Sequence, residues 1–167
     1  MRPAVTVRQC AGFAWQNPFT RVELVEVLVA MREACGLAGV PLDVMLADDA
    51  FISKLNAAFL SCPGPTNILS FPPFACYRPE SGAVPGGGIL VLSLDALWRE
   101  SLLYGQEEAE YALRLLAHGM SHLAGFDHGN EMDAAQEKAL AAGRRAWFEL
   151  LGSRGRDGLT ARMEWLN

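Results

Sequence analysis

The sequence lacks the features of secreted, disulfide-bonded or membrane-spanning proteins. Its 4 cysteines are scattered and form no CxxC pair, a pattern typical of small buried side chains rather than of disulfides or metal ligands. The N-terminal residues MRPAVTVRQCAGFAWQNPF contain no unbroken apolar stretch like that of a signal peptide. The apolar run GGGILVLSL has the length of a strand and is too short to span a bilayer. We therefore expect a cytoplasmic protein with reduced thiols and no membrane partner.

Positive charge is also scarce in this chain. The 14 lysines and arginines are outnumbered by 19 aspartates and glutamates, which gives a formal net charge of −5. Such a surface is not typical of a protein that coats RNA or binds membranes. A local basic groove is still compatible with this balance, and a bound divalent metal would add positive charge where it is needed. The charge therefore weakens a nucleic-acid function without excluding it.

Repeats, low-complexity tracts and domain-sized linkers are missing as well, so the 167 residues fit one domain. We place this domain at residues 1–152 and a loosely held C-terminal tail at 153–167. A stretch rich in proline and glycine at 73–88 is expected to form a long loop. Between these landmarks, apolar periodicity indicates alternating strands and helices.

The expected fold class is α+β, with a small mixed four-stranded sheet packed with about five helices. Strands are predicted at 4–9, 41–47, 67–71 and 87–94, the last in the centre of the sheet. Helices are predicted from Pro18 or Thr20 to Gly36, from Asp48 or Asp49 through Phe59, over ALWRES with Asp95 as its cap, over 107–124 and over 131–151. The apolar stripe of the first helix is expected at Val22, Val25, Leu28 and Val29.

All 3 histidines lie in the run HGMSHLAGFDH, residues 118–128. His118 and His122 are four residues apart, so on a helix they project from the same face. Gly125 offers a place for the helix to end and the chain to turn, after which His128 can return toward the other two. Three converging imidazoles form a metal site with an open fourth position, the catalytic rather than the structural pattern. A lone histidine is usually a satisfied core residue, but that explanation does not account for this clustering.

Imidazole ligands suit zinc, nickel, copper or iron, so the residues alone do not select the metal. We favour zinc, because three neutral histidines leave a bound water with a pKa of about 7. Asp127 has two candidate functions beside this site. It orients a ligand histidine, or it accepts a proton from the water. A structural function as a turn residue is equally compatible with its position.

The spacing of the histidines also matches the metzincin zinc-protease pattern HExxHxxGxxH, with Gly125 in its expected place. The second position of that pattern carries the glutamate that activates water, and here it is Gly119. Met132 also follows too closely to serve as the distant Met-turn of those enzymes. A metzincin-like metalloprotease is therefore a disfavoured alternative.

The pattern HG-x2-H-x2-G-[FY]-D-H at 118–128 resembles the signature of the YbeY family, bacterial metal-dependent endoribonucleases of ribosomal RNA maturation. The segment LNAAFLSCPGPTNILSFP resembles a second block of that family. The matching residues of this block are Leu55, Asn56, Phe59, Pro65, Thr66, Asn67, Leu69, Ser70, Phe71 and Pro72. GGGILVLSLD at 86–95 is similar to the family's central strand, and Glu131, Met132 and Glu137 match its next helix.

This resemblance implies that His118, His122 and His128 hold one metal at the end of a groove beside the sheet. It implies a single-strand-specific endoribonuclease in 3′-end maturation of small-subunit (16S) rRNA and in ribosome quality control. The implied chemistry is phosphodiester hydrolysis by metal-activated water. Asp127 and His118 are then the catalytic candidates, with zinc as the cofactor. The implied partners are ribosomal RNA and the small ribosomal subunit, and not DNA.

The chain departs from the family pattern at several positions. Leu60 stands where the family usually carries an arginine thought to face the RNA, and residues 62–63 replace a Lys-Asp pair. Gly88 replaces an acidic residue before the central strand. Leucine cannot make the bidentate phosphate contact of a guanidinium, although Arg78 and Arg99 are candidate compensating cations. A ribosome-associated metal-binding factor with weak or no nuclease activity is therefore an alternative function.

The second block also carries polar side chains near the predicted site. Thr66, Asn67 and Ser70 are candidates for polar contacts there. Hydrogen bonding within the loop and at the strand end is the alternative, and we favour it for Ser70.

Overall fold

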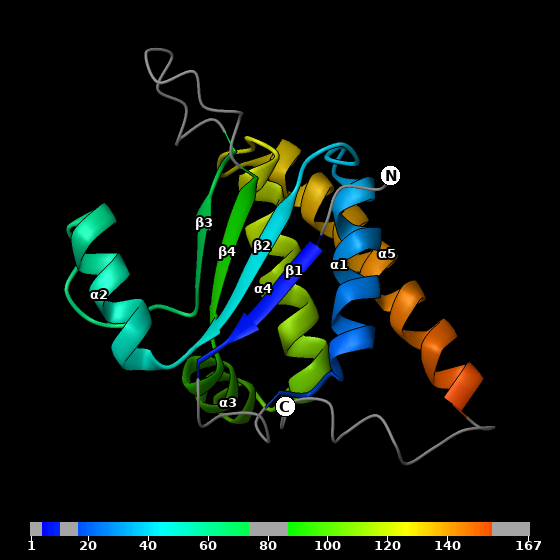
Figure 1. The fold of residues 1–167 in the computed structure, drawn as a ribbon, viewed down its shortest axis with the longest axis horizontal. Helices are drawn as coiled ribbons and strands as arrows, with labels where there is room; N and C mark the ends of the chain where they lie inside the picture. The colour runs from blue at the N-terminus through cyan, green and yellow to red at the C-terminus, as the bar shows by residue number, and fades with distance from the viewer. Residues whose placement is uncertain (1–4, 11–16, 74–86, 155–167) are drawn as a thin grey trace.

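The computed structural model describes residues 5–10, 17–73 and 87–154 (Figure 1). The strands are β1 (Val5–Gln9), β2 (Leu42–Ala47), β3 (Ile68–Phe71) and β4 (Gly88–Ser93). The helices are α1 (Arg21–Ala34), α2 (Asp49–Leu60), α3 (Leu94–Leu103), α4 (Glu108–Leu123) and α5 (Asn130–Arg154). The expected α+β class, with four strands and five helices, is confirmed for the described residues.

The four strands form one mixed sheet in the order β1-β2-β4-β3. β1, β2 and β4 run parallel, and β3 runs antiparallel to β4 with Leu69 opposite Val91. β4 is therefore internal, as its apolar sequence predicts. β3 forms an edge, and this edge lies closest to α2 in Figure 1.

Alternate side chains of the sheet point to two faces that differ in how they are covered. On the α4 face, Leu90 and Leu92 pack with residues of α1 and α4 in the main core. α5 packs in turn against α1 and α4. On the α2 face, Leu69 and Val91 pack with Ile52 of α2 in a smaller cluster. Figure 1 shows α2 standing apart from the other helices, so one face is covered by several helices and the other chiefly by one.

The predicted apolar stripe of α1 is wrong in part. Val22 is 53 % exposed, whereas the core side of the helix is formed by other residues. The buried apolar residues of α1 are Leu24, Val27, Leu28 and Met31. Their i, i+3, i+4, i+7 spacing is the regular amphipathic pattern, and contacts with β1, α4 and α5 select it over the valine-rich phase. Thr20 caps this helix in a capping box with Glu23.

The predicted cap of α3 is also wrong by two residues. Ser93 caps the helix, because its hydroxyl accepts a hydrogen bond from the Ala96 N–H at 3.1 Å. The Asp95 carboxylate instead accepts one from the Asp49 N–H at 2.9 Å and so satisfies the first turn of α2. Asp48 caps α2, as the sequence predicts.

The remaining predictions concern segments at the limits of the described residues. α5 extends through Arg154, beyond the domain boundary predicted at residue 152. The rest of the tail, and residues 74–86 of the expected long loop, lie outside the described residues.

Cys10, Cys35 and Cys62 are free thiols. Among the helices that the structure describes, none has the length and apolar character needed to cross a membrane.

Candidate active site

Helix α4 and the turn after it bring the three histidines together. α4 begins after Glu107, whose carboxylate accepts a hydrogen bond from the Glu110 N–H at 2.9 Å, and ends at Leu123. Gly125 then adopts a φ of 87°, a left-handed conformation that glycine adopts without strain. This turn directs the chain back, so that His128 lies beside the face of α4 that carries the other two imidazoles.

The separations of the three rings suit a shared ligand. The His118 and His122 ring centroids are 4.7 Å apart, those of His122 and His128 are 5.3 Å apart, and those of His118 and His128 are 6.3 Å apart. Three imidazoles bound through one nitrogen to a tetrahedral metal have centroids roughly 5 Å apart. Two of the three separations are close to that value.

Each histidine uses its Nδ1 atom in a hydrogen bond, which leaves Nε2 for another purpose. His118 Nδ1 lies 3.1 Å from Gln136 Oε1, and His122 Nδ1 lies 3.2 Å from the Phe126 carbonyl oxygen. His128 Nδ1 lies 3.0 Å from Asp127 Oδ1. When all three Nδ1 atoms donate, all three Nε2 atoms carry lone pairs, which is the arrangement that metal-ligating histidines adopt.

The positions of the three imidazoles in this structure do not form a complete metal site. Within residues 5–10, 17–73 and 87–154, no three His, Cys, Asp or Glu side chains stand together so that they could hold a metal ion. The longest ring separation involves His128, whose side chain is 79 % exposed. His128 is thus the histidine that departs most from the arrangement around a shared metal.

The electrostatic surroundings favour neutral imidazole at the centre of the cluster. Burial lowers the pKa of His122, and the neighbouring His118 lowers it further. Neutral histidine is the form that binds metals. Asp127 is exposed, and hydrogen bonds from the backbone N–H and the ring of His128 lower its pKa. This carboxylate therefore lies where it orients His128 and also supports the turn.

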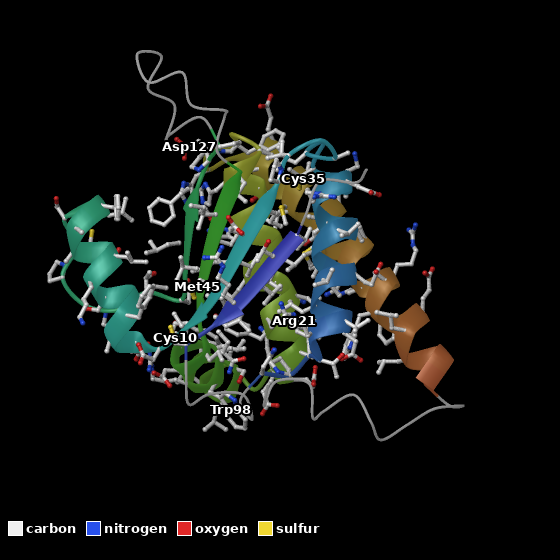
Figure 2. All side chains as sticks on the ribbon, viewed as in Figure 1. Cys10, Arg21, Cys35, Met45, Trp98 and Asp127 are labelled. Atoms are coloured by element: carbon white, nitrogen blue, oxygen red, sulfur yellow. The ribbon has the colours of Figure 1, made fainter. Side chains whose placement is uncertain are left out.

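His118 and His122 border a cleft of about 430 Å³ between α2, β3 and α4, hereafter the histidine cleft. Its lining residues are Phe59, Leu60, Ile68, Leu69, Ser70, Phe71, Pro72, His118 and His122. Leu60, at the position of the family's arginine, is 56 % exposed. The sequence thus correctly associates the second block with the histidines, because α2 and β3 form the cleft wall. Asp127 lies at the end of the sheet opposite Trp98 of α3 in Figure 2.

Gly119 faces the sheet and not the histidines. A Cβ atom at this position would lie 2.7 Å from Ile68 Cδ1 and 2.9 Å from Leu90 Cδ2, closer than real Cβ atoms approach. A glutamate at position 119 would therefore clash with the sheet before it could reach a metal held by His118 and His122. The helix geometry removes the basis for a metzincin-like protease, which needs its general base at this position.

Two polar residues of the second block, Ser70 and Asn67, have structural partners. The Ser70 hydroxyl donates to the Gly119 carbonyl at 3.1 Å and ties β3 to α4, the kind of backbone contact favoured for it. Asn67 donates to Glu100 Oε2 at 3.0 Å and accepts from the Ile68 N–H at 2.7 Å. Both residues thus position β3, and none of the three hydrogen bonds joins either side chain to a histidine.

The candidate compensating cations do not replace the family's arginine in the described structure. Arg99 pairs with Asp49 at 2.8 Å and belongs to α3, at the opposite end of the sheet from Asp127 (Figures 1 and 2). Its assignment as a compensating cation is therefore wrong. Arg78 lies outside the described residues. Gly88 begins β4, and a Cβ there would lie 3.0 Å from Leu123 Cδ1, so an acidic side chain would press against α4.

Gln136 is the site residue that sequence reasoning missed. It lies on α5, 18 residues from His118, and its Oε1 atom contacts Nδ1 of that histidine. Met132 is 2 % exposed and stands four residues before Gln136, so both project from the inward side of α5. This helical spacing is the signal that could have indicated an inward-facing amide.

Three comparisons place the chain among known proteins. The family model described as Endoribonuclease YbeY matches residues 16–144, which include all three histidines. A protein of Nitratidesulfovibrio vulgaris named endoribonuclease YbeY is 44 % identical over 142 residues, covering 77 % of this chain and 88 % of that protein. One of the same name from Oleidesulfovibrio alaskensis is 43 % identical over 147 residues, covering 77 % of this chain and 87 % of that protein.

A solved structure shares the fold. The solution structure of TM1509 from Thermotoga maritima superposes with a TM-score of 0.58 at 19 % sequence identity, covering 94 % of this chain and 100 % of that one. At this identity the likeness concerns the fold alone. The matches to the family model and to its curated members show that the chain belongs to the YbeY family.

Proposed function

We propose that this protein is a metal-dependent endoribonuclease that hydrolyses phosphodiester bonds in single-stranded RNA. The observation that carries the proposal is the orientation of the three imidazoles: each Nδ1 atom has a hydrogen-bond partner, and His118 and His122 line a cleft of about 430 Å³. The curated relatives named endoribonuclease YbeY support RNA as the substrate. We assign the protein to 3′-end maturation of small-subunit rRNA and to ribosome quality control, with the small ribosomal subunit as its partner.

The donor set fits one divalent transition metal held by the Nε2 atoms of His118, His122 and His128. Zinc is our choice, because neutral imidazoles are among its usual ligands, and nickel is compatible with the same donors. When bound, such a metal polarises a phosphoryl oxygen and makes water a stronger nucleophile at neutral pH.

Neighbouring residues orient the three imidazoles. Gln136 fixes the ring of His118 from α5, and the Phe126 carbonyl fixes that of His122. Asp127 accepts from both the backbone N–H and the ring of His128 through one oxygen, Oδ1. We therefore propose that Asp127 orients His128 and is available as a proton acceptor through its other oxygen. In the reaction a water oxygen forms a bond to phosphorus, the bond to one ribose oxygen breaks, and the proton that the water loses ends on that ribose oxygen as a hydroxyl group.

The metal is tested first. Wild-type protein should contain about one equivalent of transition metal by elemental analysis, and His122→Ala should lose it. Asp133→Ala is the matched control, because Asp133 is an exposed carboxylate in the first turn of α5 and is not a proposed ligand. Equal metal content in His122→Ala and wild type would contradict the site.

The activity is tested with single-stranded rRNA fragments. Metal-loaded wild type should cleave them, and His118→Ala should not. RNA binding without cleavage by the wild type would favour the second candidate, a ribosome-associated metal-binding factor. The exposed Leu60 motivates that alternative, because a leucine supplies no charge to a phosphate.

A further inference from the structure

The wall of the histidine cleft opposite the histidines is apolar and exposed. Phe59 is 65 % exposed and Leu60 is 56 % exposed, both in the last turn of α2. The ring of Phe59 packs edge-on against that of Phe71 in β3, with centroids 5.1 Å apart and planes at 70°. These residues line the same cleft as His118 and His122. A large apolar surface thus stands open directly beside the proposed reaction centre.

The end of α2 is fixed in place, so this exposure is not the result of a frayed helix. The side-chain amide of Asn56 donates to the Gly64 carbonyl at 3.0 Å, and Asn56 is 7 % exposed. The Cys62 N–H donates to the Asn56 carbonyl at 3.3 Å, and Ser61 adopts the left-handed conformation that ends the helix. These bonds hold the last turn of α2, and its apolar side chains, in a defined position.

The chemistry of the cleft selects a base and not a phosphate. None of the described residues that line it is a lysine or arginine. An apolar wall cannot hold the charged backbone of RNA by ion pairing. Aromatic rings do bind the faces of unstacked bases, which are flat and uncharged, and they do so without regard to sequence. The volume of about 430 Å³ falls in the range of small-ligand pockets.

We propose that Phe59, Leu60 and Phe71 form a subsite for an unpaired nucleobase of the RNA strand being cleaved. This inference rests on the proposed ribonuclease function and specifies how its substrate is positioned. In this subsite the protein binds the RNA strand through a base, whereas an arginine at position 60 would bind it through a phosphate. A base in a duplex is stacked and paired and cannot enter, so the subsite also accounts for a preference for single strands.

Phe59→Ala tests the subsite directly. We expect the dissociation constant for a single-stranded rRNA oligonucleotide to rise about 5- to 150-fold, the range found for loss of one base-stacking ring. Phe59→Leu keeps apolar volume without a flat ring. In its folded form this variant should raise the dissociation constant less than Phe59→Ala does. Phe51→Ala is the matched control: Phe51 is 36 % exposed on the same helix but does not line the cleft. Its binding should equal that of the wild type.

Cleavage of single-stranded rRNA fragments separates this proposal from the proposed function. Phe51→Ala should cleave them at the wild-type rate, because Phe51 does not line the cleft. Unchanged RNA binding by Phe59→Ala, beside a wild type that cleaves the fragments, overturns the subsite alone. A wild type that neither cleaves nor binds the fragments overturns both proposals.

Salt and abasic RNA give a second readout. Leu60→Arg should steepen the dependence of log Kd on log salt by about 0.7, the value for one added phosphate contact on a single strand. An abasic oligonucleotide should bind wild type more weakly than the parent oligonucleotide, and Phe59→Ala should reduce that difference. Equal binding of abasic and parent RNA by wild type would contradict base recognition.

Discussion

The α4 face of the sheet is covered by α1 and α4, with α5 packed behind them, whereas α2 provides the main cover on the α2 face. The main core on the first face includes Leu90, Leu116 and Met120, each 0 % exposed. On the second face Met45 and Ile89 are only partly buried, and the histidine cleft opens beside β3. The same strands thus supply rigidity on one side and access on the other.

The two histidines of α4 lie where these two faces meet at the β3 edge. Gly119, one residue after His118, leaves no room for a Cβ atom beside Ile68 and Leu90, so its lack of a side chain lets α4 approach the sheet closely. His118 and His122 line the cleft from the same helix. The difference between the faces teaches that the packed face holds His118 and His122 in position, whereas the sparsely covered face leaves a cleft open beside them.

We expect the largest effect on the free energy of unfolding from shortening a core leucine, and we expect this effect to differ between the two faces of the sheet. Leu116→Ala should lower the free energy of unfolding by about 2–5 kcal/mol, because it leaves a cavity in a packed core. Leu55→Ala on α2 should cost clearly less, because Leu55 is only partly buried. Urea unfolding of both variants measures the difference. Equal losses would show that α2 packs as firmly as α4.

Gly119→Ala should have the next largest effect. The added methyl group would press on Ile68 and Leu90, and overpacking of this kind costs about 1–3 kcal/mol despite the better helix propensity of alanine. Metal affinity should fall together with stability, because α4 must move away from the sheet. Gly152→Ala, where no atom lies near the added group, serves as the control in urea unfolding and metal titration. A more stable Gly119→Ala protein would contradict the close approach.

The sequence predicted the strands and helices correctly where the pattern of apolar residues was local and periodic. The four strands follow from short apolar runs, and α4 follows from its regular stripe. The stripe of α1 was misplaced because valines offered a competing phase, and only contacts with β1, α4 and α5 distinguish the two. The cap of α3 was misplaced because Asp95 serves the start of α2, 46 residues earlier in the chain. Such long-range pairing leaves no local signal.

The candidate site also has a part that the sequence predicts and a part that it does not. The spacing of His118, His122 and His128 predicts their convergence, because helix geometry and one turn determine it. The partner of His118 could not be identified from spacing within one helix, because Gln136 reaches it from α5. Nor could the sequence show that Arg99 is already paired with Asp49. What the sequence misses here is contact between elements that are distant along the chain.

Gln136→Leu should weaken metal binding about 10- to 100-fold, the usual effect of removing a hydrogen bond to a ligand histidine. Gln136→Glu keeps an acceptor at the same position and should restore affinity, which a purely structural function would not explain. Long-range proton–nitrogen NMR of the metal-free protein reads the tautomer directly, and His118 should lose its Nδ1–H preference only in the leucine variant. Glu137→Leu, on the exposed side of α5, is the control.

The smallest expected effect concerns the ion pair that joins α4 to α5 on the packed face. Glu110 accepts hydrogen bonds from Arg144, including one from Nε at 3.0 Å, and from Arg114 of its own helix at 3.1 Å. The bond from Arg144 lowers the pKa of Glu110 below its usual value of 4.5. The folded state therefore binds this proton less readily than the unfolded state, so the contribution is complete above about pH 4.5 and is lost as pH falls through the folded pKa.

Glu110→Gln should accordingly lower the free energy of unfolding by about 1 kcal/mol at pH 7, a modest value because both partners of the pair are partly exposed. The deficit should shrink at pH 4 and below, where the wild type also begins to lose the charge. Urea unfolding at both pH values measures this change, and Glu149→Gln, an exposed carboxylate of α5, should stay within about 0.5 kcal/mol at each. A deficit that is the same at both pH values would mean that packing around Glu110, and not its charge, joins α5 to α4.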